Sequence, residues 1–190
     1  ETVEVMDNFQ TIVVFGLDNR SNGKLTSGNS DVIIIVTIDN RTKEVKMCSV
    51  YRDTYLDIGG GKFRKANSAF SSGGAQAAIS MLNKNLDLNI TEYVTVDFNA
   101  VVECVDELGG IELTITDEEA HLMTGYMEEI NKLTGHNSQV PKKGGTYTLD
   151  GVQATAYARI RYTAGDDYKR TQRQRDVITA MANKAKKADL

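Results

Sequence analysis

The stretch FQTIVVFGLDNRSNGKLTSGNSDVIIIVTIDN, residues 9–40, contains two apolar runs rich in β-branched residues and bounded by Gly, Asn and Asp. Runs of about four to eight such residues are typical of strands buried on both faces. We therefore expect strands at about 9–15 and 31–38. A turn at Asp39-Asn40 leads into another apolar run at 45–51, so the second and third strands should be antiparallel neighbours.

Helical periodicity dominates the rest of the chain. The patterns predict helices at 73–86, 98–108, 117–135, from Asp150 onward and at 170–187, with further strands at 91–98 and 111–115. The glycine-rich segment 57–70 and the polar segment 135–148 are interpreted as loops. These elements predict an α/β fold, a mixed central β-sheet flanked by helices in an α/β/α sandwich. A length of 190 residues suits one domain, residues 1–190.

Composition excludes several functional classes. Hydrophobic residues make up 41% of the chain and charged residues 25%, as in ordinary globular domains. No apolar run approaches the length of about eighteen residues that a membrane-spanning helix needs. A net charge of −4 and a pI near 5.3 disfavour nucleic-acid binding. Cys48 and Cys104 lack a CxxC partner, so we expect buried free thiols.

Basic residues gather near the C-terminus of this acidic chain. Residues 151–190 contain 9 Lys/Arg against 4 Asp/Glu, a net of +5. Six of them crowd into the segment 159–175, namely Arg159, Arg161, Lys169, Arg170, Arg173 and Arg175. The planar guanidinium pairs two donors with phosphate oxygens, so the cluster suggests a compact anionic ligand. A solvated basic helix face is the alternative.

Helical spacing relates the members of this cluster to one another. Arg170, Arg173 and Gln174 are spaced i, i+3 and i+4, so they share one helix face. Arg159 and Arg161 would point about 200° apart on a regular helix. We therefore expect that helix to end near Arg159 and to be followed by an extended stretch at about 159–162.

Acidic residues mark the ends of the predicted strands. Asp18 follows the first strand, Asp31 opens the second, and the pair Arg52-Asp53 follows the third. Carboxylates at adjoining strand ends suit a hard cation that bridges them to phosphate oxygens. Turn and cap residues are the alternative interpretation of the two aspartates. Lys65, in the glycine-rich segment, adds a point charge suited to a phosphate oxygen.

Taken in order, these segments resemble the LytR-CpsA-Psr family of cell-wall glycopolymer ligases from about Phe9 to Lys187. The resemblance is carried by GLDNR at 16–20, SDVIIIVTID at 30–39, SVYRDTYLDI at 49–58, KANSAF at 65–70, YVTVDF at 93–98, ELGGIEL at 107–113, LDGVQATAYARIRY at 149–162 and DDYKRTQRQRDVI at 166–178. Tyr51 stands where family members often have proline, and Phe70 where they often have tyrosine. Neither departure removes a charge.

The resemblance implies an extracytoplasmic domain of a Gram-positive cell envelope, tethered by an N-terminal membrane helix that this sequence does not include. It implies an Mg²⁺-dependent phosphotransferase that moves a glycopolymer phosphate from a polyprenyl-pyrophosphate carrier to a peptidoglycan sugar hydroxyl. Asp18 and Asp31 would hold Mg²⁺, and Asp53 would orient Arg52. The pyrophosphate would be bound by Arg52, Lys65, Arg159, Arg161, Arg170, Arg173 and Gln174. The residues expected to act in catalysis are Arg52, Asp53, Arg161 and Asp167.

Three questions stay open from the sequence. Asp18, Asp53 and Asp167 are all candidates for the general base that deprotonates the acceptor hydroxyl. The same residues would serve a pyrophosphatase in which water replaces the sugar acceptor. A non-catalytic module that binds lipid-linked glycans is the third possibility, which the presence of both Asp18 and Asp31 disfavours.

Overall fold

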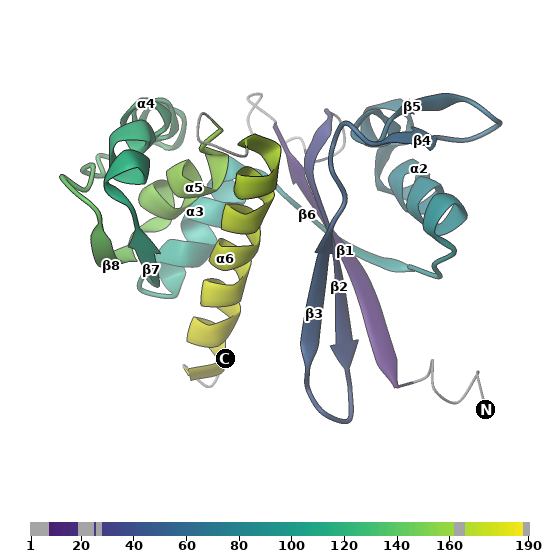
Figure 1. The fold of residues 1–190 in the computed structure, drawn as a ribbon, viewed down its shortest axis with the longest axis horizontal. Coiled ribbons are helices and arrows are strands. Elements are labelled where there is room, and N and C mark those ends of the chain that lie inside the picture. The colour runs from purple at the N-terminus through teal and green to yellow at the C-terminus, as the bar shows by residue number, and fades with distance from the viewer. Residues whose placement is uncertain (1–7, 19–24, 26–27, 162–165, 188–190) are drawn as a thin grey trace. The chain divides into compact units, whose positions relative to one another are not determined.

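The chain forms two compact units, Glu1–Asp97 and Phe98–Leu190, each considered separately below. Figure 1 shows the fold of this computed structural model, which describes residues 8–18, 25, 28–161 and 166–187. Among the described residues, none of the helices combines the length and apolar composition that crossing a bilayer requires.

A four-stranded sheet forms the centre of the N-terminal unit. Its strands are β1 (Phe9–Leu17), β2 (Ser30–Asp39), β3 (Val45–Ser49) and β6 (Glu92–Val96), in the order β3-β2-β1-β6. β2 pairs antiparallel with β1 and β3, whereas β6 pairs parallel with β1. The mixed sheet and the β2–β3 hairpin are therefore confirmed. Ile33, Ile34, Ile35 and Val36 are all buried, as the continuous apolar run predicted.

Helix α2 (Ser68–Leu86) packs on one face of this sheet. Val13 and Phe15 alternate along β1 and join a buried cluster with Phe70 and Leu82 of the helix. The rings of Phe15 and Phe70 meet edge to face, with their centroids 5.3 Å apart. The helix begins earlier than predicted, at Ser68, and its backbone leaves helical geometry at Gly73 and Gly74. Those glycines are where the sequence pattern placed the helix start.

The segment predicted as a glycine-rich loop contains a hairpin instead. β4 (Tyr55–Asp57) pairs antiparallel with β5 (Phe63–Lys65). Gly59, Gly60 and Gly61 all have positive φ, at 125°, 63° and 75°, a conformation that glycine adopts without steric cost. The Ile58 N–H donates to the Lys62 carbonyl and closes the turn at 2.8 Å. The loop prediction was wrong here because each strand is only three residues long, which is too short to give a strand pattern in the sequence.

Helices dominate the C-terminal unit. Its elements are α3 (Phe98–Glu107), β7 (Ile111–Ile115), α4 (Asp117–Thr134), β8 (Gly145–Leu149), α5 (Gly151–Arg159) and α6 (Asp166–Lys187). β7 and β8 form an antiparallel pair. β8 overlaps the end of the predicted loop 135–148, so the loop prediction is wrong for residues 145–148. Its short strand is defined by pairing with distant β7, including a contact between the Thr114 and Thr146 hydroxyls at 2.8 Å.

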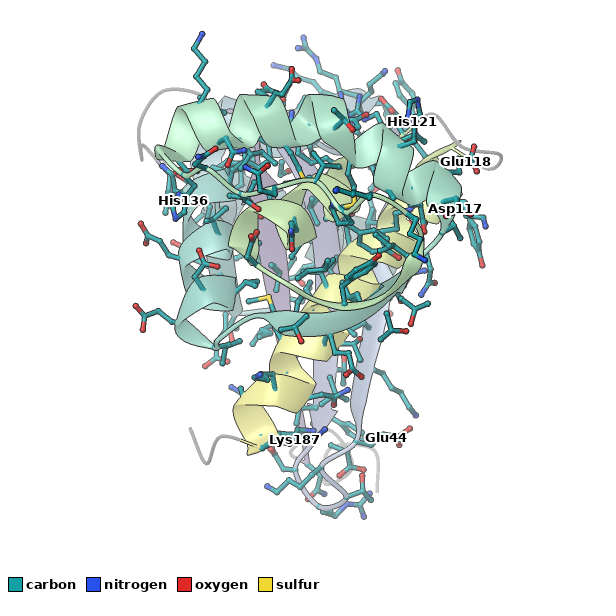
Figure 2. All side chains as sticks on the ribbon, turned by 90° about the vertical axis from the view of Figure 1, so that its left-hand side faces the viewer. Glu44, Asp117, Glu118, His121, His136 and Lys187 are labelled. Atoms are coloured by element: carbon teal, nitrogen blue, oxygen red, sulfur yellow. The ribbon has the colours of Figure 1, made fainter. Side chains whose placement is uncertain are left out.

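Capping boxes fix the starts of two of these helices. The Thr116 hydroxyl accepts from the Glu119 N–H at 3.1 Å, and the Glu119 carboxylate accepts from the Thr116 N–H at 2.9 Å. Asp150 and Gln153 repeat the arrangement at the start of α5. Figure 2 shows Asp117, Glu118 and His121 at the beginning of α4 and His136 beyond its far end. Both helix starts agree with the sequence prediction.

Three other predictions need correction or qualification. α5 ends at Arg159 as expected, and Ile160 is extended with φ −56° and ψ 127°. Arg161 belongs to no strand, and residue 162 lies outside the described residues. α6 begins at Asp166, one turn before the predicted start. Cys48 and Cys104 are free thiols but are exposed rather than buried, because each occupies an outward position on its element.

Gly151 allows α5 to pack directly against α3. A Cβ at this position would lie 2.2 Å from the Val102 carbonyl oxygen and 2.6 Å from its Cα. Both clashing atoms are backbone, so a rotamer change cannot relieve the contact. The close packing of the C-terminal unit therefore requires glycine here.

We expect Gly151→Ala to lower the free energy of unfolding by about 3 kcal/mol, because the backbones must separate. Gly125→Ala is the matched control in the exposed interior of α4, where a new Cβ meets nothing within 4 Å. That control should stabilise the chain by about 0.5–1 kcal/mol. Urea denaturation of both variants measures the difference, and equal stabilities would contradict the packing described here.

Candidate anion-binding site

The first group of predicted site residues lies where β1 ends and β2 begins. Leu17, the last residue of β1, pairs with Ser30, and the register shifts between Gly16 and Leu17. Asp18 directly follows this bulge and is exposed. Asp31, the second residue of β2, keeps 18% of its side chain exposed. The strand pairing therefore brings both aspartates to the same edge of the sheet, as predicted.

The Asp31 carboxylate joins three segments of the N-terminal unit. One oxygen accepts a short charge-assisted hydrogen bond from Arg52 Nη1, in the loop after β3. The other accepts from Asn67 Nδ2 at 3.3 Å, at the start of α2. The Asn67 N–H in turn donates to the Arg52 carbonyl at 3.0 Å. The guanidinium is thus held at the sheet edge by one carboxylate and by the backbone around it.

Asp31, Arg52, Asp53 and Lys65 form a charge network, in which Asp53 contacts both cations. Its Oδ1 lies 2.6 Å from Lys65 Nζ, and its Oδ2 lies 3.7 Å from Arg52 Nε. Asp53 was expected to orient Arg52, yet its shorter contact is with Lys65. The side chains become more exposed along the network, from 23% for Arg52 to 43% for Asp53 and 63% for Lys65. Two cations and two carboxylates thus alternate from the sheet edge toward solvent.

Asp18 and Asp31 supply the hard oxygen donors that Mg²⁺ prefers. Mg²⁺ is usually bound by one or two carboxylates and takes its remaining ligands from water and substrate oxygens. The donor set therefore fits the ion, although Asp31 would share its charge with Arg52. Within the described part of the chain, no three His, Cys, Asp or Glu side chains gather into a metal-binding cluster.

In the C-terminal unit, Arg173 of α6 is buried, with 4% of its side chain exposed. Its Nε donates to Glu119 Oε1 at 2.7 Å, and its Nη1 donates to the Ile160 carbonyl at 3.3 Å. Burial opposes ionisation of Glu119, but the Thr116 N–H and the Arg173 guanidinium together hold the pKa of Glu119 below its ordinary value. The same ion pair therefore joins α6 to the capped start of α4.

Arg159 is held by aromatic rings as well as by charge. Its guanidinium carbon lies 4.4 Å from the centre of the Phe98 ring and 5.4 Å from that of Tyr126. Nη2 lies 2.9 Å from Glu129 Oε2. Nη1 is buried and has no hydrogen-bond partner among the described residues. A buried donor without a partner is costly, so this nitrogen is suited to bind an acceptor atom of a ligand.

The remaining predicted residues differ in their exposure. Arg170 is 4% exposed and lies 2.9 Å from Asp167, one helical turn earlier. Gln174 is 9% exposed, whereas Arg161 is exposed. The alternative interpretation of a solvated basic helix face is therefore wrong for Arg170 and Arg173, the two arginines of the shared face.

Sequence reasoning missed the partners that position these arginines. Glu119 and Glu129 were not predicted as site residues, yet they contact Arg173 and Arg159, and Asn67, whose amide suits a phosphate oxygen, was not predicted to bind Asp31. The sequence signal for Asn67 was its position in KANSAF, residues 65–70, one of the segments that carry the family resemblance. No local pattern singled out the two glutamates, because each lies at least 30 positions from its arginine along the chain.

Comparison with known proteins gives a consistent result along the whole chain. The model of the LytR_cpsA_psr family matches residues 2–190. The chain is also similar to the polyisoprenyl-teichoic acid–peptidoglycan teichoic acid transferase TagU of Enterococcus faecalis, with 34% identity over 176 residues. That match covers 92% of this chain and 53% of the transferase, so the chain spans about half the length of this relative.

Solved structures agree with the observed fold. A structure of TagT bound to LI-WTA matches with a TM-score of 0.77 and 31% identity, covering 95% of this chain and 66% of that one. A structure of the LytR-CPS2A-psr family protein YwtF (TagT) with bound octaprenyl pyrophosphate lipid matches with a TM-score of 0.74 and 29% identity, covering 94% and 65%. The predicted α/β fold class with its mixed sheet is confirmed.

We expect Arg173→Met to lower the free energy of unfolding by about 3 kcal/mol at pH 7, because it leaves the Glu119 carboxylate, only 12% exposed, without its cation. The depressed pKa of Glu119 stabilises the fold above its ordinary value of 4.5, and this contribution is lost as the pH falls through the folded-state pKa. Thermal unfolding from pH 7 to pH 3 should therefore show the difference from the native chain shrinking below about pH 4.5.

Lys46→Met is the control, because Lys46 and Glu44 form an exposed pair 3.7 Å apart. It should change stability by less than about 0.5 kcal/mol at any of these pH values. A stability difference for Arg173→Met that stays constant with pH would show that the Glu119 pair is not its source.

Proposed function

This chain belongs to the LytR-CpsA-Psr family, and from that premise we propose that it transfers a glycopolymer phosphate from a polyprenyl-pyrophosphate carrier to a peptidoglycan sugar hydroxyl. Polyprenyl phosphate is the other product. The domain works at the extracytoplasmic face of a Gram-positive cell envelope. The names of similar transferases and the pyrophosphate lipid bound in a similar structure support this substrate class.

The observation that carries the proposal is the charge network at the sheet edge. Arg52 is held in place by Asp31 and by the backbone of Asn67. Lys65 is more exposed and forms an ion pair with Asp53. A pyrophosphate diester carries a negative charge on each phosphate. Two cations of different exposure suit such a ligand, because its phosphates lie side by side and both need neutralisation.

The chemistry follows from where negative charge develops. As the acceptor hydroxyl attacks the glycan-linked phosphorus, the bond to the bridging oxygen breaks and polyprenyl phosphate departs with an additional negative charge. Arg52 and Lys65 are held in place by Asp31 and Asp53, so their donors would stabilise that charge with little reorganisation, which is the usual source of large rate enhancements. The proton of the acceptor hydroxyl passes to a carboxylate, for which Asp18, Asp53 and Asp167 are the candidates.

Asp18 and Asp31 would hold Mg²⁺ in this proposal. A bound divalent cation would polarise the phosphoryl oxygens and add to the charge stabilisation supplied by the side chains. Asp31 then has two functions, since its carboxylate also accepts the hydrogen bond from Arg52. Replacing Asp31 is expected to affect both the cation and the arginine.

The C-terminal unit would contribute Arg159, Arg161, Arg170, Arg173 and Gln174 to the substrate. The unsatisfied Nη1 of Arg159 supports this assignment, because a phosphate oxygen would satisfy it. Arg173 differs, since Glu119 and the Ile160 carbonyl already occupy two of its three nitrogens. Its first function is to position α6 against α4 and the end of α5.

The direct test is incubation of the purified chain with a short-chain polyprenyl-pyrophosphoryl disaccharide, magnesium and a peptidoglycan oligomer, followed by mass spectrometry. A phosphoglycan adduct on the oligomer that disappears with EDTA would support the proposal. Polyprenyl phosphate and free sugar phosphate without an adduct would favour the hydrolase. Tight lipid binding without turnover would favour the binding module.

In this assay Arg52→Ala and Arg161→Ala should each reduce transfer by roughly 100-fold or more, because each removes a positive charge that we assign to the leaving phosphate. Arg161 is exposed, and Asp31 keeps its hydrogen bond from Asn67 when Arg52 is removed, so both variants should fold. Arg41→Ala is the control, on a surface arginine whose side chain is 64% exposed. A large loss of melting temperature in both site variants would instead make these arginines structural.

A further inference from the structure

The β4–β5 hairpin presents an aromatic pair to solvent. Tyr55 is 69% exposed and Phe63 is 52% exposed. Their rings stack with centroids 5.9 Å apart and an interplanar angle of 29°. Contiguous exposed apolar side chains rimmed by polar residues are typical of surfaces that contact a partner or a membrane. The pair stands on the face of the hairpin opposite Leu56, which packs into the core of the N-terminal unit.

Basic residues accompany this aromatic pair on the hairpin: Lys65 pairs with Tyr55 on the same face, whereas Arg64 pairs with Leu56 on the other face. Every residue from 59 to 65 is exposed, and this run contains Lys62, Arg64 and Lys65 but no acid. The one acidic residue of the hairpin, Asp57, is buried and lies 2.6 Å from Lys84. The Lys84 ammonium and the Gly59 N–H hold the pKa of Asp57 below its ordinary value, so this charge is already neutralised. The hairpin is thus basic on a chain whose net charge is −4.

The tip of the hairpin consists of glycine. New Cβ atoms at Gly59, Gly60 and Gly61 would meet nothing within 4 Å, so the tip is not packed against other residues. The base, in contrast, is fixed to the charge network. Lys65 contacts Asp53, and the Ala66 N–H donates to the Thr54 carbonyl at 2.8 Å. The hairpin is therefore a projection that is anchored beside Arg52.

We propose that this hairpin docks on the interfacial region of a lipid bilayer containing anionic phospholipids. Aromatic rings favour the depth of the headgroups, where an apolar body meets polar surroundings. Lys62 and Arg64 are exposed on either side of Phe63 in the sequence, and their long side chains match the negative surface charge of such a bilayer. A sugar-stacking platform fits less well, because residues 55–65 offer no exposed carboxylate or amide to bind sugar hydroxyls.

The inference deepens the proposed function, and its benefit for catalysis rests on that function. A polyprenyl carrier keeps its pyrophosphate at the membrane surface and its chain in the bilayer. A hairpin docked there would hold the network of Arg52 and Lys65 at the level of the pyrophosphate. Binding of the chain to vesicles is measured without any turnover, so failure of the docking and failure of the transfer are distinguishable.

The experiment is co-sedimentation of the 190-residue chain with vesicles of phosphatidylcholine and phosphatidylglycerol at 7:3, in about 0.1 M salt. The native chain should bind these vesicles and not vesicles of phosphatidylcholine alone. Two double variants, Tyr55→Ser with Phe63→Ser and Lys62→Glu with Arg64→Glu, should each lower the vesicle partition coefficient by roughly tenfold or more. Circular dichroism confirms that both variants are folded.

Arg41→Glu with Lys46→Glu is the matched control. It makes the same change in net charge on exposed residues around the β2–β3 turn, at the opposite end of those strands from Arg52. This variant should bind like the native chain. Equal binding by all variants, or no binding by the native chain at this salt concentration, would overturn the proposal. If the hairpin double variants lost binding to soluble peptidoglycan fragments while their binding to vesicles was unchanged, the proposal would be overturned in favour of a glycan-binding platform.

Discussion

The carboxylate of Asp31 is the constraint on which the N-terminal unit depends. It accepts hydrogen bonds from Arg52 and Asn67, and therefore ties the start of β2 to the loop after β3 and to the start of α2. A carboxylate with 18% exposure at a sheet edge needs such partners, because burial without them would raise its free energy. Satisfying Asp31 also fixes the guanidinium that the substrate would meet, so stability and function share one interaction.

Arginine has two different uses in this chain. Arg173 is 4% exposed and its contacts join α4, α6 and the end of α5, so its guanidinium serves as a structural connector. Arg52 is more exposed, with 23% of its side chain accessible, and it lies between the carboxylates of Asp31 and Asp53. The planar, permanently charged guanidinium suits both tasks, since it makes several directed hydrogen bonds wherever it lies. Removing Arg173 should therefore affect folding first, whereas removing Arg52 should affect chemistry first.

Local signals in the sequence predicted the elements that depend on local physics. The apolar run of β2 and the capping box at Thr116 locate their elements to within one or two residues. The β4–β5 hairpin and β8 were missed, because strands of three to five residues depend on pairing with distant partners. The site divides in the same way. The strand ends predicted Asp31, but no spacing rule could pair Arg173 with Glu119, 54 positions away.

The charge network of Arg52 and Lys65 is proposed to bind two adjacent phosphates, and calorimetric titration with soluble prenyl phosphates tests this most directly. Farnesyl pyrophosphate and farnesyl monophosphate have the same chain and differ only in the second phosphate. We expect at least roughly tenfold tighter binding of the pyrophosphate, and loss of this preference in Arg52→Ala. Equal affinity for the two ligands, or a preference that survives in Arg52→Ala, would contradict it.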